Sequence, residues 1–290
     1  MKNSVSSVRD AVLWAASFLN KKGINNGRLE AELLMARAMG KNRAAVLACF
    51  PDEVPQAVFH KFRQLVEKRG RHFPLQYLTG IQDFMSLPFY VEEGVLVPRE
   101  DTEVLVETIL QLGRSFENIL EVGTGSGIIA VSLAKYISGV KITATDISGK
   151  ALEVARKNAE ALGVQERIRF IQADVFRWTP AEKYDLIVSN PPYISREEMR
   201  GLQKEVLFEP VEALDGGERG LDFYFRLAEL AKEYLVPSGI LAVEIGYRQA
   251  LEVRGIFERA GLTGIEVIQD YAGRDRVVLC KKGKECNCEE

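Results

Sequence analysis

The spacing of apolar residues predicts a purely helical region before residue 75. There, apolar positions recur every three or four residues, which places them on one face of a helix. Such stripes run from Val8 to Leu19, Leu29 to Ala38, Ala44 to Phe50 and Val58 to Val66. Glycines or a proline follow them, and these residues commonly end helices. We therefore predict a small helical bundle, whose apolar stripes form an ordinary core or, alternatively, a surface that docks a substrate.

Residues 76–98 have a different character and separate this bundle from the rest of the chain. Alternating apolar residues between Phe84 and Val97 predict a β-hairpin whose turn is Glu92-Glu93-Gly94. Asp101 or Thr102 is then expected to cap the next helix, because short polar side chains accept hydrogen bonds from free N–H groups there. We expect a helical domain over 1–75, a hairpin connector over 76–98, a large α/β domain over 99–282 and a disordered tail over 283–290.

After residue 118, strand and helix patterns alternate, as in a doubly wound sheet. Short branched apolar runs predict strands over 118–122, 141–145, 168–172, 184–189, 239–245, 264–268 and 275–281. Helical spacing predicts helices over 103–113, 127–137, 149–162, 220–235 and 248–260. The fold class is therefore α/β, with a mostly parallel seven-stranded sheet. Ligands of such sheets bind at the carboxyl ends of the strands, where the strand order reverses.

Composition limits the partners that this chain can have. The 290 residues are 47% hydrophobic and carry a net charge of −3, so a large core is expected but no overall basic field for nucleic acid. No long apolar segment or secretory leader is present, so we expect a cytoplasmic protein with no membrane partner. The four cysteines predict no disulfide framework, and Cys286 and Cys288 are too few for a zinc site, so no metal is expected. His60 and His72 are expected at the surface or between domains.

One strand of the predicted sheet ends in Asn190-Pro191-Pro192-Tyr193. The prolines stop the strand and remove two backbone donors, which leaves a rigid row of acceptors: the Asn190 side-chain oxygen and the carbonyls of Asn190 and Pro191. With the ring of Tyr193 beside them, these acceptors suit a planar –NH2 group. A plain strand with a proline turn is the alternative. The motif resembles that of methyltransferases that act on amino groups.

A glycine-rich segment at the end of the first predicted strand indicates a ligand loop. Glu121 begins it, followed by Gly123, Thr124, Gly125, Ser126 and Gly127. Position 128 is Ile, so the dinucleotide fingerprint is incomplete, and a simple turn is the alternative. Acids at the next two strand ends favour a ligand. Asp146, beside Ile147, suits ribose hydroxyls, and Asp174, beside Val175 and Phe176, suits an adenine amino group. Glu121 suits the amino group of a methionine moiety, so the set fits S-adenosylmethionine rather than a phosphate-bearing dinucleotide.

Together these motifs resemble the release-factor glutamine N5-methyltransferases, the PrmC/HemK family. The resemblance covers nearly the whole chain, including Pro74 to Gly80, Leu87-Pro88-Phe89, Val97 to Glu103, Glu121 to Gly127, Ser189 to Ile194, Glu209-Pro210, Ala213 to Gly217 and Ala272 to Val277. Glu100 stands where the family usually has proline, and Arg219 where an aspartate is common.

The resemblance implies methylation of the glutamine amide in the Gly-Gly-Gln loop of peptide-chain release factors, which modulates translation termination. S-adenosylmethionine is the implied cofactor and S-adenosylhomocysteine the product. The implied catalytic and substrate-binding residues are Asn190, Pro191, Pro192 and Tyr193, with substrate contacts also from Arg99 and Thr102. Cofactor binding is expected from Asn190, from Glu121 and the loop residues Gly123 to Gly127, from Asp146 and Ile147, and from Asp174, Val175 and Phe176. Residues 1–75 would recognise the substrate and residues 99–282 would form the methyltransferase domain.

The sequence is also compatible with other functions. The same methyl transfer could act on a ribosomal-protein glutamine or on adenine in nucleic acid. An adenine enzyme needs a basic cleft, which the negative net charge disfavours. A non-catalytic S-adenosylmethionine- or RNA-binding module would show a degraded acceptor motif, whereas Asn190 to Tyr193 is complete. We expect a monomer that acts on a protein substrate.

Overall fold

The structure, a computed structural model, describes residues 7–283. The chain forms two compact units: residues up to Ile81 together with Gln203–Phe208, and Gln82–Leu202 together with the residues from Glu209 onward. Most of the predicted tail, including Cys286 and Cys288, lies outside the described residues. Within residues 7–283, no helix combines the length and apolar character needed to cross a membrane.

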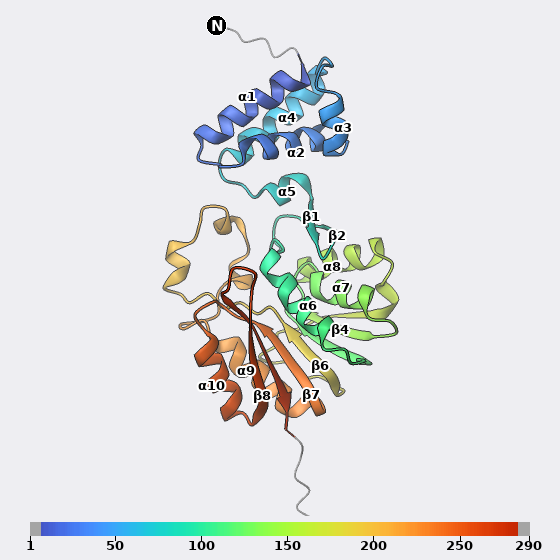
Figure 1. The fold of residues 1–290 in the computed structure, drawn as a ribbon, viewed down its shortest axis with the longest axis vertical. Helices are drawn as coiled ribbons and strands as arrows, with labels where there is room; N and C mark the ends of the chain where they lie inside the picture. Colours follow the sequence, from blue (N-terminus) through green and yellow to red (C-terminus); the bar gives the residue numbers. More distant parts are fainter. Residues whose placement is uncertain (1–6, 284–290) are drawn as a thin grey trace, which may run out of the picture. The chain divides into compact units, whose positions relative to one another are not determined.

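The first unit is helical, as the apolar stripes predict (Figure 1). Its helices are α1 (Val8–Lys21), α2 (Gly27–Met39), α3 (Arg43–Ala48), α4 (Gln56–Arg69) and α5 (Leu75–Thr79). The stripes face inward: Leu19, Leu34, Phe62 and Val66 are fully buried. They therefore form the core of the bundle, the first of the two interpretations given above.

Gln203–Phe208, a segment distant in sequence, packs on this helical unit. The Arg69 side chain is buried and donates hydrogen bonds to both Glu30 and Glu205. The Phe208 ring lies edge-on to Phe73, with centroids 5.2 Å apart. This segment was not predicted to belong to the helical unit, because sequence spacing gives no signal for a pairing over more than a hundred residues.

A short hairpin follows, but its turn is not where the sequence predicted it. Strands β1 (Ile81–Phe84) and β2 (Leu87–Tyr90) form a two-stranded sheet. Met85 and Ser86 form the turn, with φ of 50° and 58°. Two residues at positive φ match the twist of a tight hairpin, so the hairpin is complete before residues 92–94, where the turn was predicted.

The second unit contains the predicted seven-stranded sheet, with order β5-β4-β3-β6-β7-β9-β8. Its strands are β3 (Asn118–Val122), β4 (Lys141–Asp146), β5 (Ile168–Gln172), β6 (Tyr184–Ser189), β7 (Leu235–Glu244), β8 (Leu262–Gln269) and β9 (Asp275–Lys282). All neighbours pair in parallel except at β9, which is antiparallel to both β7 and β8. The predicted fold class is confirmed.

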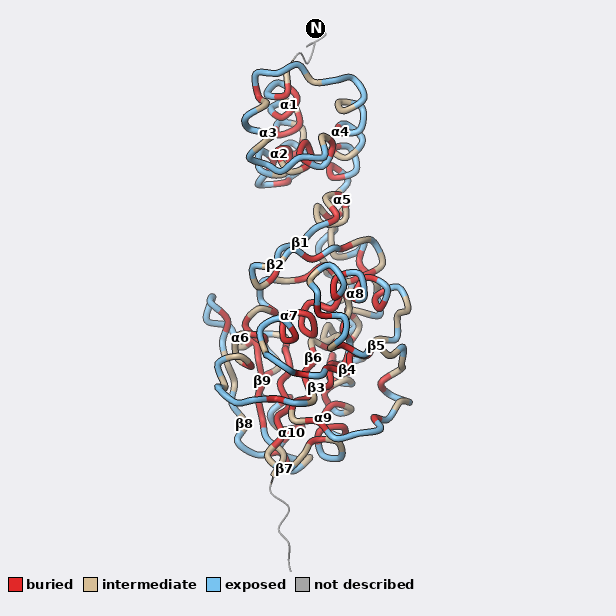
Figure 2. Tube along the Cα trace, turned by 90° about the vertical axis from the view of Figure 1, so that its right-hand side faces the viewer, coloured by how far each residue is buried: buried red, intermediate tan, exposed pale blue. Residues whose placement is uncertain are grey.

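Helices cover both faces of this sheet (Figure 1), which buries its central strands (Figure 2). One face carries α6 (Glu103–Gln111), α7 (Ile128–Tyr136) and α8 (Gly149–Ala161), and the other α9 (Asp222–Tyr234) and α10 (Ala250–Arg259). Short 3₁₀ turns complete the chain at Glu100–Thr102, Gln165–Arg167, Glu198–Gly201, Val206–Phe208 and Val211–Ala213. Three layers thus hold the strand ends in fixed positions.

Thr102 is the N-cap residue of α6, as predicted, but the expected capping hydrogen bond is absent. Its backbone angles are helical. The 3₁₀ turn at Glu100–Thr102 runs directly into the helix. The Thr102 hydroxyl instead donates a hydrogen bond to the buried carboxylate of Glu244, the last residue of β7.

Strand order reverses between β3 and β6, because β4 lies on one side of β3 and β6 on the other. The register pairs Val122 with Ser189 at the carboxyl ends of these two strands. Consequently the glycine-rich loop after β3 and the Asn190-Pro191-Pro192-Tyr193 motif after β6 begin side by side, at the place where doubly wound sheets bind ligands.

Candidate active site

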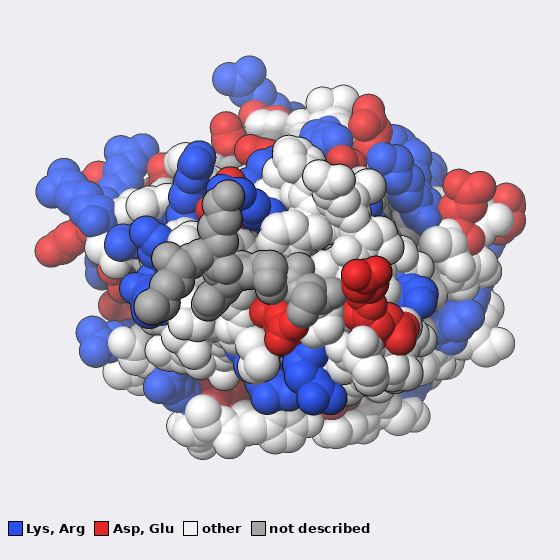
Figure 3. All heavy atoms as spheres, turned by 90° about the horizontal axis from the view of Figure 1, so that it is seen from above, with Lys and Arg blue, Asp and Glu red and all other residues white. Residues whose placement is uncertain are grey.

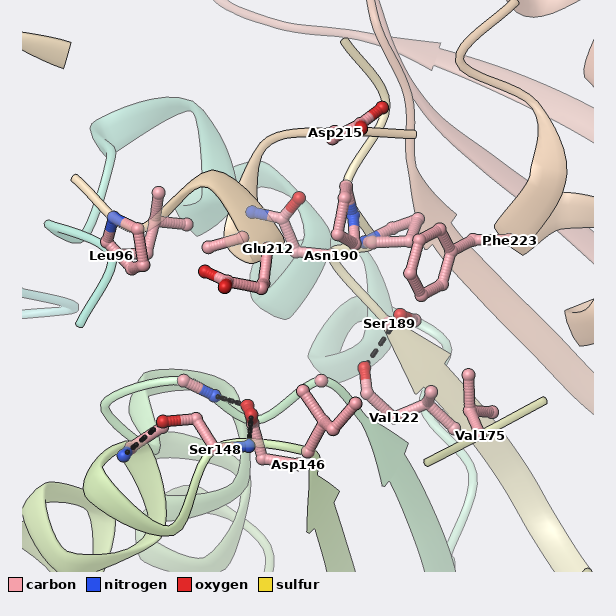
Figure 4. Close-up of a pocket in the computed structure, with 18 of the residues that line it drawn as sticks. Leu96, Val122, Asp146, Ser148, Val175, Ser189, Asn190, Glu212, Asp215 and Phe223 are labelled. Atoms are coloured by element: carbon pink, nitrogen blue, oxygen red, sulfur yellow. Dashed lines mark hydrogen bonds between the residues drawn. The ribbon is translucent and has the colours of Figure 1, made fainter. Parts of the chain in front are cut away.

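A pocket of about 750 Å³ opens at this reversal of strand order. Figure 4 shows Asp146 and Ser148 on one wall, with Asn190, Glu212 and Leu96 on the other. The predicted site residues that line it are Gly123, Gly125, Asp146, Ile147, Asp174, Val175, Phe176, Asn190, Pro191 and Pro192. Glu121, Thr124, Ser126, Gly127, Tyr193, Arg99 and Thr102 do not line it.

Glycines at 123 and 125 keep one wall open. Both have positive φ, 74° and 55°, and a Cβ at either position would meet no atom within 4 Å. The N–H groups of Gly123 and Thr124 donate to the Thr145 carbonyl, which holds the loop on the end of β4. A side chain at these positions would project into space that a ligand needs, so the geometry is that of a cradle.

Gly127 has a different role from the other loop glycines. A Cβ there would lie 2.9 Å from the Ala155 Cβ, inside the contact distance. Its absence therefore lets α7 begin close against α8. Gly127 thus serves the packing of α7 against α8, and it does not line the pocket.

Asp146, at the end of β4, lines the pocket next to the glycine-rich loop. Its two carboxylate oxygens accept hydrogen bonds from the Gly125 N–H and the Ser148 N–H, both at 2.8 Å. Burial raises the pKa of Asp146, and these backbone donors oppose that rise. The carboxylate is thereby fixed in the pocket with lone pairs left for further donors, as ribose hydroxyls would require.

Asp174, Val175 and Phe176 lie together further along the pocket. The Phe176 N–H donates to the Asp174 carboxylate at 3.0 Å, which orients the acid. The Phe176 ring packs edge-on against Phe223, with centroids 5.0 Å apart. Phe223 was not predicted from the sequence. A polar acceptor beside apolar surfaces suits a flat heterocycle that carries an amino group.

Glu121 lies beneath the glycine-rich loop and is fully buried. One carboxylate oxygen, Oε2, accepts from the Thr124 hydroxyl at 2.6 Å and the Ala130 N–H at 3.1 Å. The other, Oε1, has no hydrogen-bond partner in the described part of the chain. Burial raises the pKa of Glu121 to about 8. An unpartnered buried carboxylate oxygen next to an open loop fits a cationic donor, such as the ammonium group of S-adenosylmethionine.

Charges around the pocket favour a cationic ligand. Its acidic lining residues outnumber the one arginine, Arg196; they are Asp146, Asp174, Glu212, Asp215 and Asp222. Arg196 is itself 3.8 Å from the Asp215 carboxylate. Such a lining attracts a sulfonium and an ammonium, and it repels the phosphates of a dinucleotide. The orphaned Glu121 oxygen, the open loop and this charge balance all fit S-adenosylmethionine.

Asn190 lies at the edge of the pocket, and its side-chain amide is oriented by Thr102, which lies outside the pocket. Its Nδ2 donates to Thr102 Oγ1 at 3.0 Å, and Thr102 Oγ1 donates to Glu244 Oε2 at 2.6 Å. The structure therefore places Thr102 behind Asn190 rather than in the pocket. The sequence analysis did not identify Glu244. A carboxylate at the end of a buried strand, as at Glu121, was the signal that could have revealed this residue.

Tyr193 is placed differently from the prediction of an open stacking surface. It does not line the pocket, and its hydroxyl donates to Glu244 Oε1 at 3.3 Å. Burial and the nearby Glu244 raise the pKa of Tyr193 well above its usual value. Tyr193 is therefore a neutral hydrogen-bond donor to the same carboxylate that holds Thr102.

Backbone contacts fix the shape of the Asn190-Pro191-Pro192-Tyr193 motif. Ile194 pairs with the segment at Leu214 to Gly216 through two backbone hydrogen bonds, and a Cβ on Gly216 would lie 2.7 Å from the Pro192 carbonyl. The Gln249 amide donates to the Tyr193 carbonyl at 3.0 Å. The Ala213 to Gly217 motif is thus the support of the acceptor edge.

Arg99 lies outside the pocket and forms an ion pair with Glu209. Glu209 is buried and also accepts a hydrogen bond from the Val97 N–H at 3.1 Å. Both partners belong to segments that the sequence analysis singled out, Val97 to Glu103 and Glu209-Pro210. Their pairing links these two segments beside the pocket, which is lined by Pro210 and by Leu96, the residue before Val97.

Comparison with known proteins gives consistent matches. Residues 10–80 match the PrmC N-terminal domain and residues 99–219 the methyltransferase small domain. The release factor glutamine methyltransferase of Moorella thermoacetica is 43% identical over 282 residues, which cover 96% of this chain and 100% of that protein. That of Geobacter sulfurreducens is 40% identical over 278 residues, covering 96% and 97%.

Among solved structures, a methyltransferase from Pyrococcus furiosus shares the fold, with a TM-score of 0.53 and 22% identity over 69% of this chain and 90% of that chain. The fold is thus a Rossmann-like sheet, and the matched domain together with the curated relatives defines the class as a methyltransferase. Within that class, the chain belongs to the release factor glutamine methyltransferase family, because the curated relatives match it at 40% and 43% identity over nearly their whole length. The family resemblance predicted from the sequence is confirmed.

Proposed function

We propose that this chain transfers a methyl group from S-adenosylmethionine to the side-chain amide nitrogen of the glutamine in the Gly-Gly-Gln motif of peptide-chain release factors, forming N5-methylglutamine. Within the site, the orientation of the Asn190 side-chain amide is the observation that supports this proposal. Its Nδ2 end is bound to Thr102, which leaves the Oδ1 end for the pocket that Asn190 lines. An acceptor in this position suits a substrate –NH2 group.

The chemistry needs such acceptors because an amide nitrogen is a poor nucleophile. Its lone pair is delocalised into the carbonyl group. The Asn190 Oδ1 and the Pro191 carbonyl oxygen would accept the two hydrogens of the substrate –NH2, which raises the electron density on nitrogen and fixes the direction of its lone pair. Pro191 and Pro192 line the pocket and keep this edge rigid. After transfer the nitrogen loses its proton readily to water, so no strong base is required.

In this proposal, the cofactor is held by the loop after β3 and by acids at or near the ends of β3, β4 and β5. Bound S-adenosylmethionine supplies an electrophilic methyl group on a sulfonium. Glu121 would accept from the ammonium group, Asp146 from the ribose hydroxyls and Asp174 from the adenine amino group, whereas Phe176 would cover the ring. Gly123 and Gly125 leave space for close approach. Thr124 supports Glu121, and Ser126 and Gly127 stabilise the loop from behind.

The protein partner is expected to contact more than the pocket. We propose that the helical domain, residues 1–75, recognises the release factor, that the enzyme acts as a cytoplasmic monomer, and that nucleic acid is not a substrate. In the view of Figure 3, positive and negative side chains are interspersed over the visible face, without a continuous basic field. That pattern favours a protein partner over a nucleic-acid backbone.

The experiment is methyl transfer from labelled cofactor to purified release factors, with DNA, RNA and ribosomes in parallel reactions. The label should appear on the Gly-Gly-Gln glutamine, located by peptide mass spectrometry. A release factor with that glutamine replaced by alanine is the matched control and should remain unlabelled. Label in ribosomal protein or adenine, with none in the release factors, would refute the proposed substrate.

A further inference from the structure

The orientation of the Asn190 amide is set by two buried residues outside the pocket. Thr102 is 0% exposed and Glu244 is 1% exposed. The hydrogen-bond chain runs from Asn190 Nδ2 to Thr102 Oγ1 at 3.0 Å and from Thr102 Oγ1 to Glu244 Oε2 at 2.6 Å. Three separate elements thus meet at one hydroxyl: the motif after β6, the 3₁₀ turn before α6, and the end of β7.

The direction of this chain follows from the number of hydrogens available. A threonine hydroxyl has one hydrogen, and an ionised carboxylate only accepts. Thr102 therefore gives its hydrogen to Glu244 and offers only a lone pair to Asn190. The Asn190 amide must therefore direct its –NH2 group toward Thr102, because the reverse orientation would place Asn190 Oδ1 against the lone pair of Thr102 Oγ1. The oxygen of Asn190 is left for the pocket.

Several charged and titratable groups surround the Glu244 carboxylate and decide its state. The Tyr193 hydroxyl donates to Oε1, and Arg276, which is paired with Asp101 at 2.9 Å and with Asp270 at 3.1 Å, attracts the carboxylate. Asp101 opposes it, and the Tyr224 hydroxyl donates to the Glu244 backbone carbonyl. Burial raises the pKa of Glu244 to about 7, while Thr102, Arg276 and Tyr193 act in the opposite direction.

We propose that Thr102 and Glu244 are positioning residues that hold Asn190 with its oxygen toward the substrate, and that this orientation selects a carboxamide over a carboxylate. The inference rests on the proposed function, since it concerns the same site. Asn190 Oδ1 and the Pro191 carbonyl present two acceptors, which bind an –NH2 group and repel a carboxylate. A reversed Asn190 would present donors to the same position and would tolerate a carboxylate.

The orientation of the Asn190 amide also depends on whether Glu244 is protonated. A protonated Glu244 donates its own hydrogen to Thr102 Oγ1, and the Thr102 hydrogen is then free to turn toward Asn190. That state favours the reversed amide, with its oxygen bound to Thr102. Turnover at saturating substrates should therefore fall as the pH drops and Glu244 takes up a proton.

The test compares Thr102→Val, which keeps the shape but removes the hydroxyl, with Thr102→Ser, which keeps the hydroxyl. With the release factor as substrate, kcat should fall about 100-fold in Thr102→Val, the size of effect expected from a misoriented catalytic group, and should stay near wild type in Thr102→Ser. A release factor with glutamate in place of the Gly-Gly-Gln glutamine should inhibit Thr102→Val more strongly than wild type. A merely structural role for Thr102 would not improve the binding of that variant.

Affinity for S-adenosylhomocysteine, measured by calorimetry, and thermal melting report whether each variant retains its fold. Equal kcat in Thr102→Val and wild type, or equal inhibition by the glutamate variant, would overturn the inference while leaving the proposed function intact. Absence of release factor methylation by the wild-type enzyme would instead overturn the proposed function.

A second variant keeps the inference testable if Thr102→Val fails to fold. Glu244→Gln has nearly the same shape and cannot titrate. At saturating substrates, kcat of the wild type should fall as the pH is lowered through about 7, and this acid limb should be absent in Glu244→Gln. An identical acid limb in both proteins would contradict the role of Glu244.

Discussion

The Ser189 hydroxyl donates a hydrogen bond of 2.7 Å to the Val122 carbonyl, and the two residues are register partners at the ends of β6 and β3. Both residues are buried. Val122 immediately precedes the glycine-rich loop and Ser189 immediately precedes Asn190. One side-chain hydrogen bond therefore ties the proposed cofactor loop to the proposed acceptor edge at the reversal of strand order.

Replacing this serine should loosen both halves of the site. In Ser189→Ala the buried Val122 carbonyl loses a donor, so the free energy of unfolding should fall by about 1–3 kcal/mol. Turnover should fall as well, because one of the contacts that hold the two strand ends together is lost. Urea denaturation and steady-state kinetics measure these effects. Ser138→Ala, at an exposed position, is the matched control and should change neither quantity.

Asn190→Ala should remove methyl transfer while leaving the cofactor pocket largely intact. The substitution deletes the side-chain acceptor but keeps the backbone of the motif, which Gln249 and the Leu214 to Gly216 segment hold. We expect kcat to fall at least about 100-fold. Affinity for S-adenosylhomocysteine, measured by calorimetry, should change little. Near-normal turnover in this variant would contradict the proposed role of Asn190.

Much of the fold could be predicted because its signals are local. Strands such as β3 and β6 have a central apolar run that is buried on both faces, so their type and limits are evident from the sequence. Among the strands of the seven-stranded sheet, the largest difference is at β7, which begins at Leu235 rather than at residue 239. The additional residues include Pro237, and the pairing with β6 has a register shift between Tyr184 and Leu186.

The acids at the strand ends were predictable for the same reason, because carboxyl ends of parallel strands meet at one edge. Partners from distant segments were not predictable. Threonine is a residue type typical of helix caps. Only the tertiary structure shows that the Thr102 hydroxyl donates to Glu244 and accepts from Asn190. Similarly, nothing in the sequence near Glu205 indicates that it binds Arg69. Hydrogen bonds between segments that are far apart in the sequence leave no trace in local spacing.

Alanine substitutions at two glycines of the same loop should separate ligand binding from folding. Gly125 and Gly127 both have positive φ, so each substitution costs about 1–2 kcal/mol of backbone strain. At Gly125 the added methyl group enters open space in the pocket, whereas at Gly127 it meets Ala155 at 2.9 Å. Gly125→Ala should therefore weaken cofactor binding more, and Gly127→Ala should lower the free energy of unfolding more.

Calorimetric titration with S-adenosylhomocysteine and urea denaturation of both variants provide the comparison. Two variants with the same loss of affinity and the same loss of stability would show that the loop responds as one unit. That outcome would contradict a cradle at Gly125 and a packing contact at Gly127.

Cofactor binding should release a proton from Glu121. Its pKa of about 8 lies above the value of 4.5 for a free glutamate, because burial disfavours the charged form. At pH 7 the side chain of the free protein is therefore mostly protonated, and it must ionise to pair with the ammonium group of the cofactor. Affinity should consequently rise with pH up to about 8 and change little above it.

The raised pKa also has a consequence for the ligand-free protein. The folded state holds a proton on Glu121 that the unfolded chain has already lost above about pH 4.5. The contribution of this group to stability is thus fully present below pH 4.5 and is lost as the pH rises through 8. In that interval it lowers the free energy of unfolding by about 1.4 kcal/mol per pH unit.

Titration calorimetry in buffers of different ionisation enthalpy counts the released protons directly. At pH 7 the wild type should release close to one proton per cofactor bound. Glu121→Gln preserves the shape and the Thr124 contact but has no proton to lose, so its proton release should vanish and its affinity should no longer depend on pH in this range. Equal proton release by the two proteins would assign the ionisation to another group, because the glutamine side chain of the variant cannot supply it, and would remove Glu121 from the proposed ammonium site.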